Sequence, residues 1–198
     1  LLFSDQAKYI YIGRDGRDVV WSFYNHHLKA NDDWYALLNE SPGLVGPPIE
    51  RPNPNIVQYF KEWLEQDGYP IWPFWENIRS WWEIRDLPNV YLLHFNDLKQ
   101  DMAGEIRKIA EFLQIEIEEA QWDLILKHCT FDYMKANASN YAPAGGAIWD
   151  GGAETFINKG VNGRWHEMLP SQLSHAYEER AVAELGSDCS RWLAGRNQ

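Results

Sequence analysis

The stretch from Lys8 to Tyr24 constrains the fold more than any other part of the sequence. It opens with a short apolar, β-favouring run, Tyr9 to Ile12, which predicts a buried parallel strand. After Gly13 the apolar residues take helical spacing, and Asp15 is a candidate N-cap for the helix that follows. A strand, a charged turn and a helix in this order are typical of an α/β fold.

The same stretch places candidate anion ligands together. Arg14 ends the predicted strand, and Ser22 lies off the apolar stripe of the helix, one turn after Asp18 and one turn before His26. In open α/β sheets ligands bind at this end of a strand, and an arginine beside free helix N–H groups suits a phosphate or a sulfate. The alternative is that Arg14 simply pairs with Asp15 or Asp18.

Composition limits the function classes. A chain of 198 residues suits one domain with a sizeable core, and its net charge of −11 argues against a nucleic-acid partner. A small anion can still bind where a few basic groups converge. Cys129 and Cys189 are too few for a disulfide framework or a metal cluster, which weakly favours a reducing compartment. No apolar run approaches the roughly 20 residues of a membrane helix, so we expect a cytoplasmic protein without a membrane partner.

The rest of the chain is mostly helical, with one further strand at residues 89–95. The proline-rich segment 41–54 is expected to be irregular, either as a wall of a site or as a plain connector. Residues 138–156 are expected to form a flexible loop anchored by Tyr141 and Trp149. The patterns predict helices at residues 31–39, 55–66, 74–87, 117–128, 132–137 and 170–185, one after the second strand that runs to about residue 114, and a short segment around 189–193.

A second basic turn, Asn158–Lys159–Gly160 followed by Arg164, also favours an anion, because glycine lets backbone N–H groups approach it closely. Taken alone, Lys159 could equally be a surface charge and Gly160 an ordinary turn residue. His26–His27 with Asp32–Asp33 suggests a metal, but adjacent histidines on a helix point about 100° apart, so no metal site is expected.

Taken together, these motifs resemble the cytosolic sulfotransferases. Residues 8–24 resemble the region that grips the 3′-phosphate of the sulfate donor PAPS, where a strand ends in Arg and a helix supplies Ser eight residues later. Residues 156–165 resemble the family's second signature, an aromatic residue and a Lys–Gly turn followed by Gly-x-Trp. Nearly the whole chain is covered, because three intervening segments keep the family's order and spacing: 80–83, 92–99 and 128–135.

The resemblance implies site residues and a fold. Arg14 and Ser22 would bind the 3′-phosphate of PAPS or of its product PAP. Phe156, Lys159 and Gly160 would complete that site, Gly160 through its backbone N–H. Three consecutive residues would border the adenine: Cys129, Thr130 and Phe131. The implied fold is α/β and helix-rich, a P-loop-type three-layer arrangement of a parallel sheet flanked by helices, incomplete at its N-terminus.

The chain departs from the family pattern at several points. Asn158 stands where the family usually has Arg, which removes a bidentate phosphate contact, and Arg17 or Arg164 could compensate. Phe95, which would belong to the cofactor site, replaces a frequent Tyr, so stacking is kept but a hydroxyl is lost. The family's general-base histidine and its lysine-bearing loop for the 5′-phosphosulfate lie upstream of this strand. We therefore expect residues 1–198 to be one sulfotransferase domain lacking its 5′-phosphosulfate-binding part, with no catalytic residue of its own and the missing elements upstream of Leu1.

The implied reaction is transfer of a sulfuryl group from PAPS to a hydroxyl or amine of a small-molecule acceptor, without a metal. The loops around residues 24–30 and 138–149 would approach that acceptor. The main alternative is a catalytically inactive sulfotransferase-like protein that binds a nucleotide or a partner, favoured by Asn158. A nucleotide kinase is a third candidate. The acceptor's identity and the oligomeric state, a homodimer included, stay open.

Overall fold

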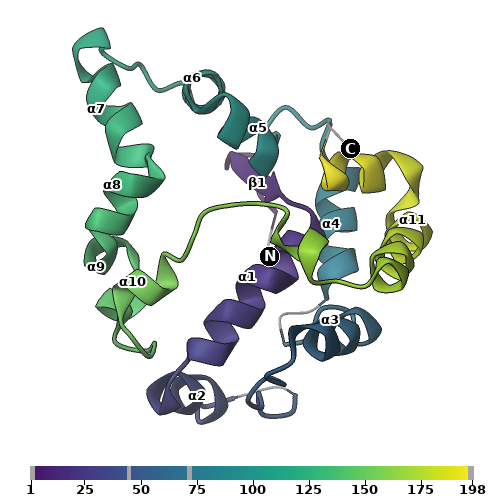
Figure 1. Cartoon of the computed structure of the whole chain (residues 1–198). Coiled ribbons are helices and arrows are strands. Elements are labelled where there is room, and N and C mark those ends of the chain that lie inside the picture. The colour runs from purple at the N-terminus through teal and green to yellow at the C-terminus, as the bar shows by residue number, and fades with distance from the viewer. Residues whose placement is uncertain (1–2, 44–45, 71–72, 196–198) are drawn as a thin grey trace.

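The computed structural model describes residues 3–43, 46–70 and 73–195. Its centre is a pair of parallel strands, β1 (Tyr9–Gly13) and β2 (Val90–His94), with Tyr9 opposite Val90 and Gly13 opposite His94. Figure 1 shows the helices arranged around these strands. The predicted parallel α/β arrangement is confirmed, and the sheet has two strands in the part of the chain that the structure describes.

The helices follow the predicted pattern closely, because their caps are encoded locally. Asn55, for example, accepts hydrogen bonds from the N–H groups of Val57 and Gln58. The helix expected to run to residue 114 is in fact two, because Asp101 caps a new helix by accepting from the Gly104 N–H. The helices are α1 (Gly16–Lys29), α2 (Asp32–Asn39), α3 (Ile56–Glu65), α4 (Phe74–Glu83), α5 (Phe95–Gln100), α6 (Met102–Leu113), α7 (Glu119–Cys129), α8 (Phe131–Ala136), α9 (Ala138–Tyr141), α10 (Ala153–Phe156), α11 (Ser171–Ala194), and the 3₁₀ turns η1 (Pro143–Gly146) and η2 (Arg164–Glu167).

Helices pack on both faces of the sheet. On one face the ring of Tyr11 stacks on Trp81 of α4, with centroids 5.4 Å apart. On the other, Tyr91 packs on Phe112 of α6 at 5.5 Å. The expectation that β1 is a buried strand is wrong: Ile10 is 42% and Ile12 50% exposed. Helix α6 packs on Tyr91 of β2 and leaves these two β1 side chains half uncovered.

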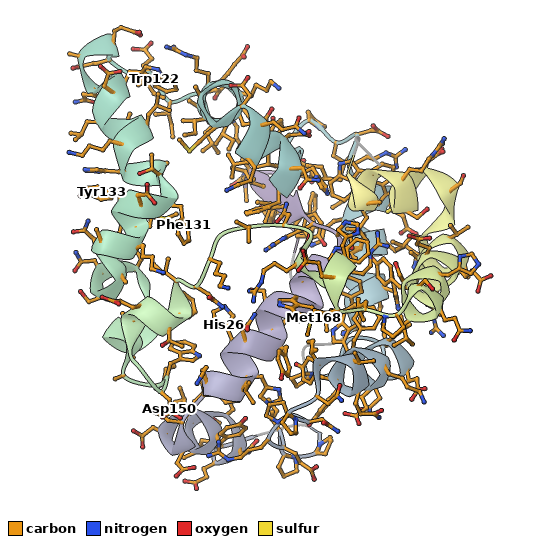
Figure 2. All side chains as sticks on the ribbon, viewed as in Figure 1. His26, Trp122, Phe131, Tyr133, Asp150 and Met168 are labelled. Carbon is orange, nitrogen blue, oxygen red and sulfur yellow. The ribbon has the colours of Figure 1, made fainter. Side chains whose placement is uncertain are left out.

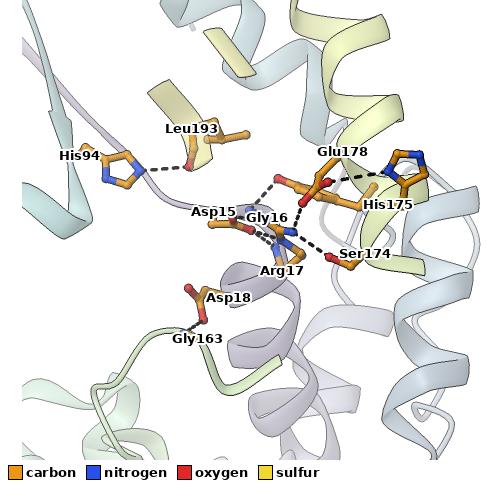
Figure 3. Close-up of polar contacts among 11 residues, drawn as sticks. Asp15, Gly16, Arg17, Asp18, His94, Gly163, Ser174, His175, Glu178 and Leu193 are labelled. Carbon is orange, nitrogen blue, oxygen red and sulfur yellow. Dashed lines mark hydrogen bonds and ion pairs between the residues drawn. The ribbon is translucent and has the colours of Figure 1, made fainter. Parts of the chain in front are cut away.

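The hydrophobic core lies between α1, α3, α4 and α11 and is rich in aromatic rings. Phe60 and Val20 are fully buried there, and Trp75 packs on Tyr177 with centroids 5.7 Å apart. The predicted break of the last helix is confirmed at Gly186, whose φ of 75° lies in the left-handed region. The final segment then turns back so that the carbonyl of Leu193 meets the His94 ring (Figure 3).

The two irregular segments differ from plain connectors. Residues 44–45 of the proline-rich segment lie outside the described part, and side chains from its second half, Pro47 to Asn53, line a cavity of about 470 Å³. Two aromatic residues were expected to anchor the 138–156 loop, and of these Trp149 does so whereas Tyr141 does not. Trp149 is buried and pairs with Ala30 in a β-bridge, whereas Tyr141 is 45% exposed.

Candidate anion-binding site

A cavity of about 200 Å³ lies between α1, the start of α8 and the segment 156–161. Figure 2 shows Phe131 on the α7–α9 side of this region and His26 on the α1 side. Residues from three distant stretches of sequence therefore meet here. The cavity is lined by seven of the ten side chains proposed from the sequence: Arg14, Ser22, Phe131, Phe156, Asn158, Lys159 and Gly160.

Arg14 reaches this cavity from the end of β1. Its Nη2 donates to Asn162 Oδ1 at 2.7 Å, and its guanidinium lies 4.5 Å from the centroid of the Phe95 ring. Its Nε is buried without a hydrogen-bond partner, and within the described residues no carboxylate forms an ion pair with it. Burial lowers the pKa of Arg14 while the charges of Asp18 and Asp15 act in the opposite direction.

The nearby carboxylates are engaged elsewhere, so the pairing of Arg14 with Asp15 or Asp18 is wrong. Asp15 forms an ion pair with Arg17, whose Nη2 lies 2.6 Å from Asp15 Oδ2 (Figure 3). Asp18 accepts from the backbone N–H of Gly163 at 2.8 Å, and burial raises its pKa. Arg14 is left as a half-buried cation that lines the cavity, and no carboxylate among the described residues is bonded to it.

Arg17 itself does not serve the cavity. It is 1% exposed, donates to Glu178 at 2.6 Å, and its guanidinium lies 3.8 Å from the Trp165 ring. Its role as a substitute for the missing family arginine is therefore excluded by its position. Arg164, the other candidate, lines the cavity.

Backbone N–H groups without a protein acceptor come from the later loop, not from the first turn of α1. In the first turn of α1 the N–H of Gly16 donates to the Tyr177 hydroxyl at 2.9 Å, and the N–H of Arg17 donates to Asp15 at 2.8 Å. The expected free helix N–H groups beside Arg14 are therefore absent from this described turn.

The loop of residues 158–162 supplies these groups instead. Within the described residues, its N–H groups donate to no protein acceptor. Gly160 has a φ of 62° and lies so close to the Phe131 ring that a Cβ would come within 2.5 Å of it. Successive free N–H groups around a left-handed residue form a concave site for an anion.

The cavity-facing side of α1 follows the predicted spacing. Ser22 and His26 both line the cavity, and the His26 ring packs on Phe156 with centroids 4.7 Å apart. Burial lowers the pKa of His26, which favours the neutral imidazole. Sequence reasoning missed Trp21 and Asn25, although Asn25 stands three residues after Ser22, a spacing that shares a helix face.

Three proposed ligands lie outside the cavity lining. Phe95 stacks on the guanidinium of Arg14, Cys129 is exposed at the end of α7, and Thr130 caps α8 by accepting from the Tyr133 N–H at 3.2 Å. A place for Cys129 and Thr130 beside an adenine stays a prediction.

A second cavity, of about 630 Å³, adjoins the first and shares Arg14, Ser22, His26 and Phe156 with it. The loops expected to approach an acceptor both contribute to its walls. Its remaining lining is largely apolar: Val19, Phe23, His27, Trp34, Leu38, Ile49, Pro70, Pro143 and Trp149. Among the described residues no three His, Cys, Asp or Glu side chains are grouped to hold a metal, and no helix is long and apolar enough to cross a membrane.

Comparison with known proteins identifies the family. The model of the sulfotransferase domain matches residues 1–187. The chain belongs to the sulfotransferase domain family. Rat sulfotransferase 2A6 is 32% identical over 179 residues, which cover 90% of this chain and 56% of that protein. Human sulfotransferase 1E1 is 29% identical over 184 residues, with 92% and 56% coverage. The chain thus spans a little over half the length of these sulfotransferases.

Solved structures show the same sulfotransferase fold. Mouse sulfotransferase SULT7A1, complexed with PAP, superposes with a TM-score of 0.67 at 23% identity and covers 95% of this chain and 62% of its own. Retinol dehydratase, in complex with androsterone and PAP, gives a TM-score of 0.65 at 26% identity, with 91% and 48% coverage. The α/β fold that the sequence resemblance implied is therefore confirmed.

Proposed function

We propose that the 200 Å³ cavity holds the 3′-phosphate end of PAPS and that the complete protein transfers the sulfuryl group of PAPS to a small-molecule hydroxyl or amine, leaving PAP. The observation that carries the proposal is that Arg14, a half-buried cation without a bonded carboxylate in the described part, lines the same cavity as the 158–161 segment, whose amides donate to no protein acceptor. An arginine fork and backbone N–H groups are the donors that a phosphate monoester takes.

The proposed roles follow from position. Arg14 would donate through its guanidinium, Ser22 through its hydroxyl and Lys159 through its ammonium group, while Phe156 and Phe131 form the apolar walls. Transfer of this kind depends on holding donor and acceptor in line, which fixed side chains can do, and the family resemblance implies that no metal takes part. The general base and the 5′-phosphosulfate loop stay predictions about sequence upstream of Leu1. A cytoplasmic location stays a prediction from the sequence, and the oligomeric state, a homodimer included, stays open.

The adjoining cavity supports an apolar acceptor. Its volume of about 630 Å³ is that of a site for a small molecule, and aromatic and proline side chains dominate its walls. It opens onto the first cavity beside Ser22 and His26. We propose that it takes a ring-containing molecule, in keeping with the retinol and androsterone bound in retinol dehydratase structures.

The test uses the complete protein and two nucleotides, PAP and adenosine 5′-phosphate, which lacks the 3′-phosphate. Titration calorimetry should show that PAP binds at least about tenfold more tightly, and Arg14→Ala should abolish that preference, because one charged bidentate contact contributes on the order of 2 kcal/mol. The exposed Arg191→Ala variant is the matched control. Equal affinities for the two nucleotides in the unmodified protein would overturn the proposal.

A second candidate function rests on Asn158, which gives the cavity an amide where an arginine would supply a second guanidinium. In that case the protein binds PAP without transferring sulfate. An assay with sulfur-labelled PAPS and a panel of phenols, alcohols and amines separates the two, since only the enzyme produces a labelled product.

A further inference from the structure

Two lysines that do not line the cavity hold the anion-binding loop by its backbone carbonyl oxygens. Lys135 of α8 donates through Nζ to the carbonyl oxygen of Asn158 at 2.9 Å. Lys99 of α5 donates to the carbonyl oxygen of Gly160, also at 2.9 Å. Neither ammonium group lines the cavity, and neither forms an ion pair within the described residues. Both lysines therefore place their positive charge on the backbone of one short loop, and Lys135 Nζ also lies 5.7 Å from the centroid of the Phe131 ring.

These two bonds fix the direction of the loop's amides. In a trans peptide unit the C=O and the N–H of the next residue point in opposite directions. Holding the Asn158 oxygen on one side therefore directs the Lys159 N–H to the other, and holding the Gly160 oxygen does the same for the Val161 N–H. Those N–H groups are among the loop amides without a protein acceptor.

Helix α5 ties this loop to Arg14 as well. Asn96 accepts from Asn162 Nδ2 at 2.5 Å, and Asn162 in turn accepts from Arg14. Phe95, at the start of the same helix, stacks on the Arg14 guanidinium. Residues of one six-residue helix, α5, thus contact both the Arg14 guanidinium and the backbone of the loop.

We propose that Lys99 and Lys135 are positioning residues for the 3′-phosphate: they pre-orient the loop amides toward the phosphate and add two positive charges behind them. The inference rests on the proposed function of this cavity. The lysines do not touch the nucleotide. Their contribution is to remove the cost of ordering the loop when the phosphate binds and to offset the protein's net charge of −11 locally.

The experiment substitutes Lys99→Met and Lys135→Met in the complete protein and measures the affinities for PAP and for adenosine 5′-phosphate. Each variant should bind PAP about tenfold more weakly, the loss expected for one charge-assisted hydrogen bond, with the affinity for adenosine 5′-phosphate unchanged. Lys99→Arg and Lys135→Arg should recover part of the loss. Lys61→Met is the matched control, because Lys61 is exposed on α3 and pairs only with Glu65.

Hydrogen exchange separates positioning from general stability. PAP should slow exchange of the Lys159 and Val161 amides in the unmodified protein and do so less in Lys135→Met, with equal melting temperatures for the two proteins. Methionine variants that keep the full preference for PAP, in a protein where Arg14→Ala loses it, would overturn the role of the lysines and leave the proposed function standing. If the unmodified protein shows no preference for PAP, the proposed function itself fails.

Discussion

Arg14 and Arg17 lie three residues apart and have opposite surroundings. Arg17 is buried against Asp15, Glu178 and the Trp165 ring, whereas Arg14 has a buried Nε without a partner and faces the cavity. Because the Asp15 carboxylate forms its ion pair with Arg17, it does not form one with Arg14. Arg17 is therefore engaged within the fold, whereas Arg14 lines the cavity without a bonded carboxylate among the described residues.

Arg17→Met should lower the free energy of unfolding by about 3–5 kcal/mol, because it leaves the Asp15 carboxylate buried without its partner. Urea denaturation of the unmodified protein and the variant measures this loss. Adding Asp15→Asn to Arg17→Met should recover part of it, since the uncompensated charge is then gone. An unchanged denaturation midpoint for Arg17→Met would contradict the assignment of a structural role.

Gly160→Ala should weaken PAP binding by at least about tenfold, because its φ of 62° disfavours a side chain and the new Cβ would lie 2.5 Å from the Phe131 ring. Gly145→Ala is the control: it has the same φ of 62°, and its Cβ would meet only the Ser139 carbonyl, at 3.7 Å. Calorimetric titration with PAP compares the two. Equal losses in both variants would show that backbone strain alone, and not the approach to Phe131, governs the effect.

His26→Phe should change how stability depends on pH. Burial lowers the pKa of His26 below its ordinary value of 6.5, so near and below that pH the unfolded chain binds the proton more readily, and the folded state loses stability as the pH falls. Phenylalanine cannot be protonated, so the variant should gain stability relative to the unmodified protein between about pH 7.5 and about pH 5.5.

Urea denaturation of both proteins at these two pH values checks the expectation. His27, whose pKa is also lowered by burial, is present in both proteins and cancels in the comparison. The same difference in stability at both pH values would contradict the burial of a neutral His26.

Local signals in the sequence predicted most of the secondary structure and one side of the site. A capping side chain bonds N–H groups two or three residues away, so Asp15 and Asn55 could be recognised as helix starts from their neighbours alone. The 3.6-residue period placed Ser22 and His26 on one face of α1, which is the face that lines the cavity. The strand end that carries Arg14 followed from the same kind of pattern.

Only the tertiary structure shows which charged side chains are paired with one another and which face the cavity. The choice between Arg14 and Arg17 depends on Glu178 and Trp165, which lie more than 140 residues away along the chain. No local pattern indicated that Tyr177 would occupy the N–H of Gly16 and so remove α1 as a source of free amides.

The residue types at the strand end, on the helix face and in the basic turn were thus predictable from local pattern. Which of their charges and N–H groups have no protein partner depends on contacts between distant parts of the chain. Capping and periodicity act within a few residues, whereas the occupancy of a donor depends on whichever acceptor the fold brings to it. Lys99 and Lys135 belong to this second class, because only the folded chain places them on the carbonyls of Gly160 and Asn158.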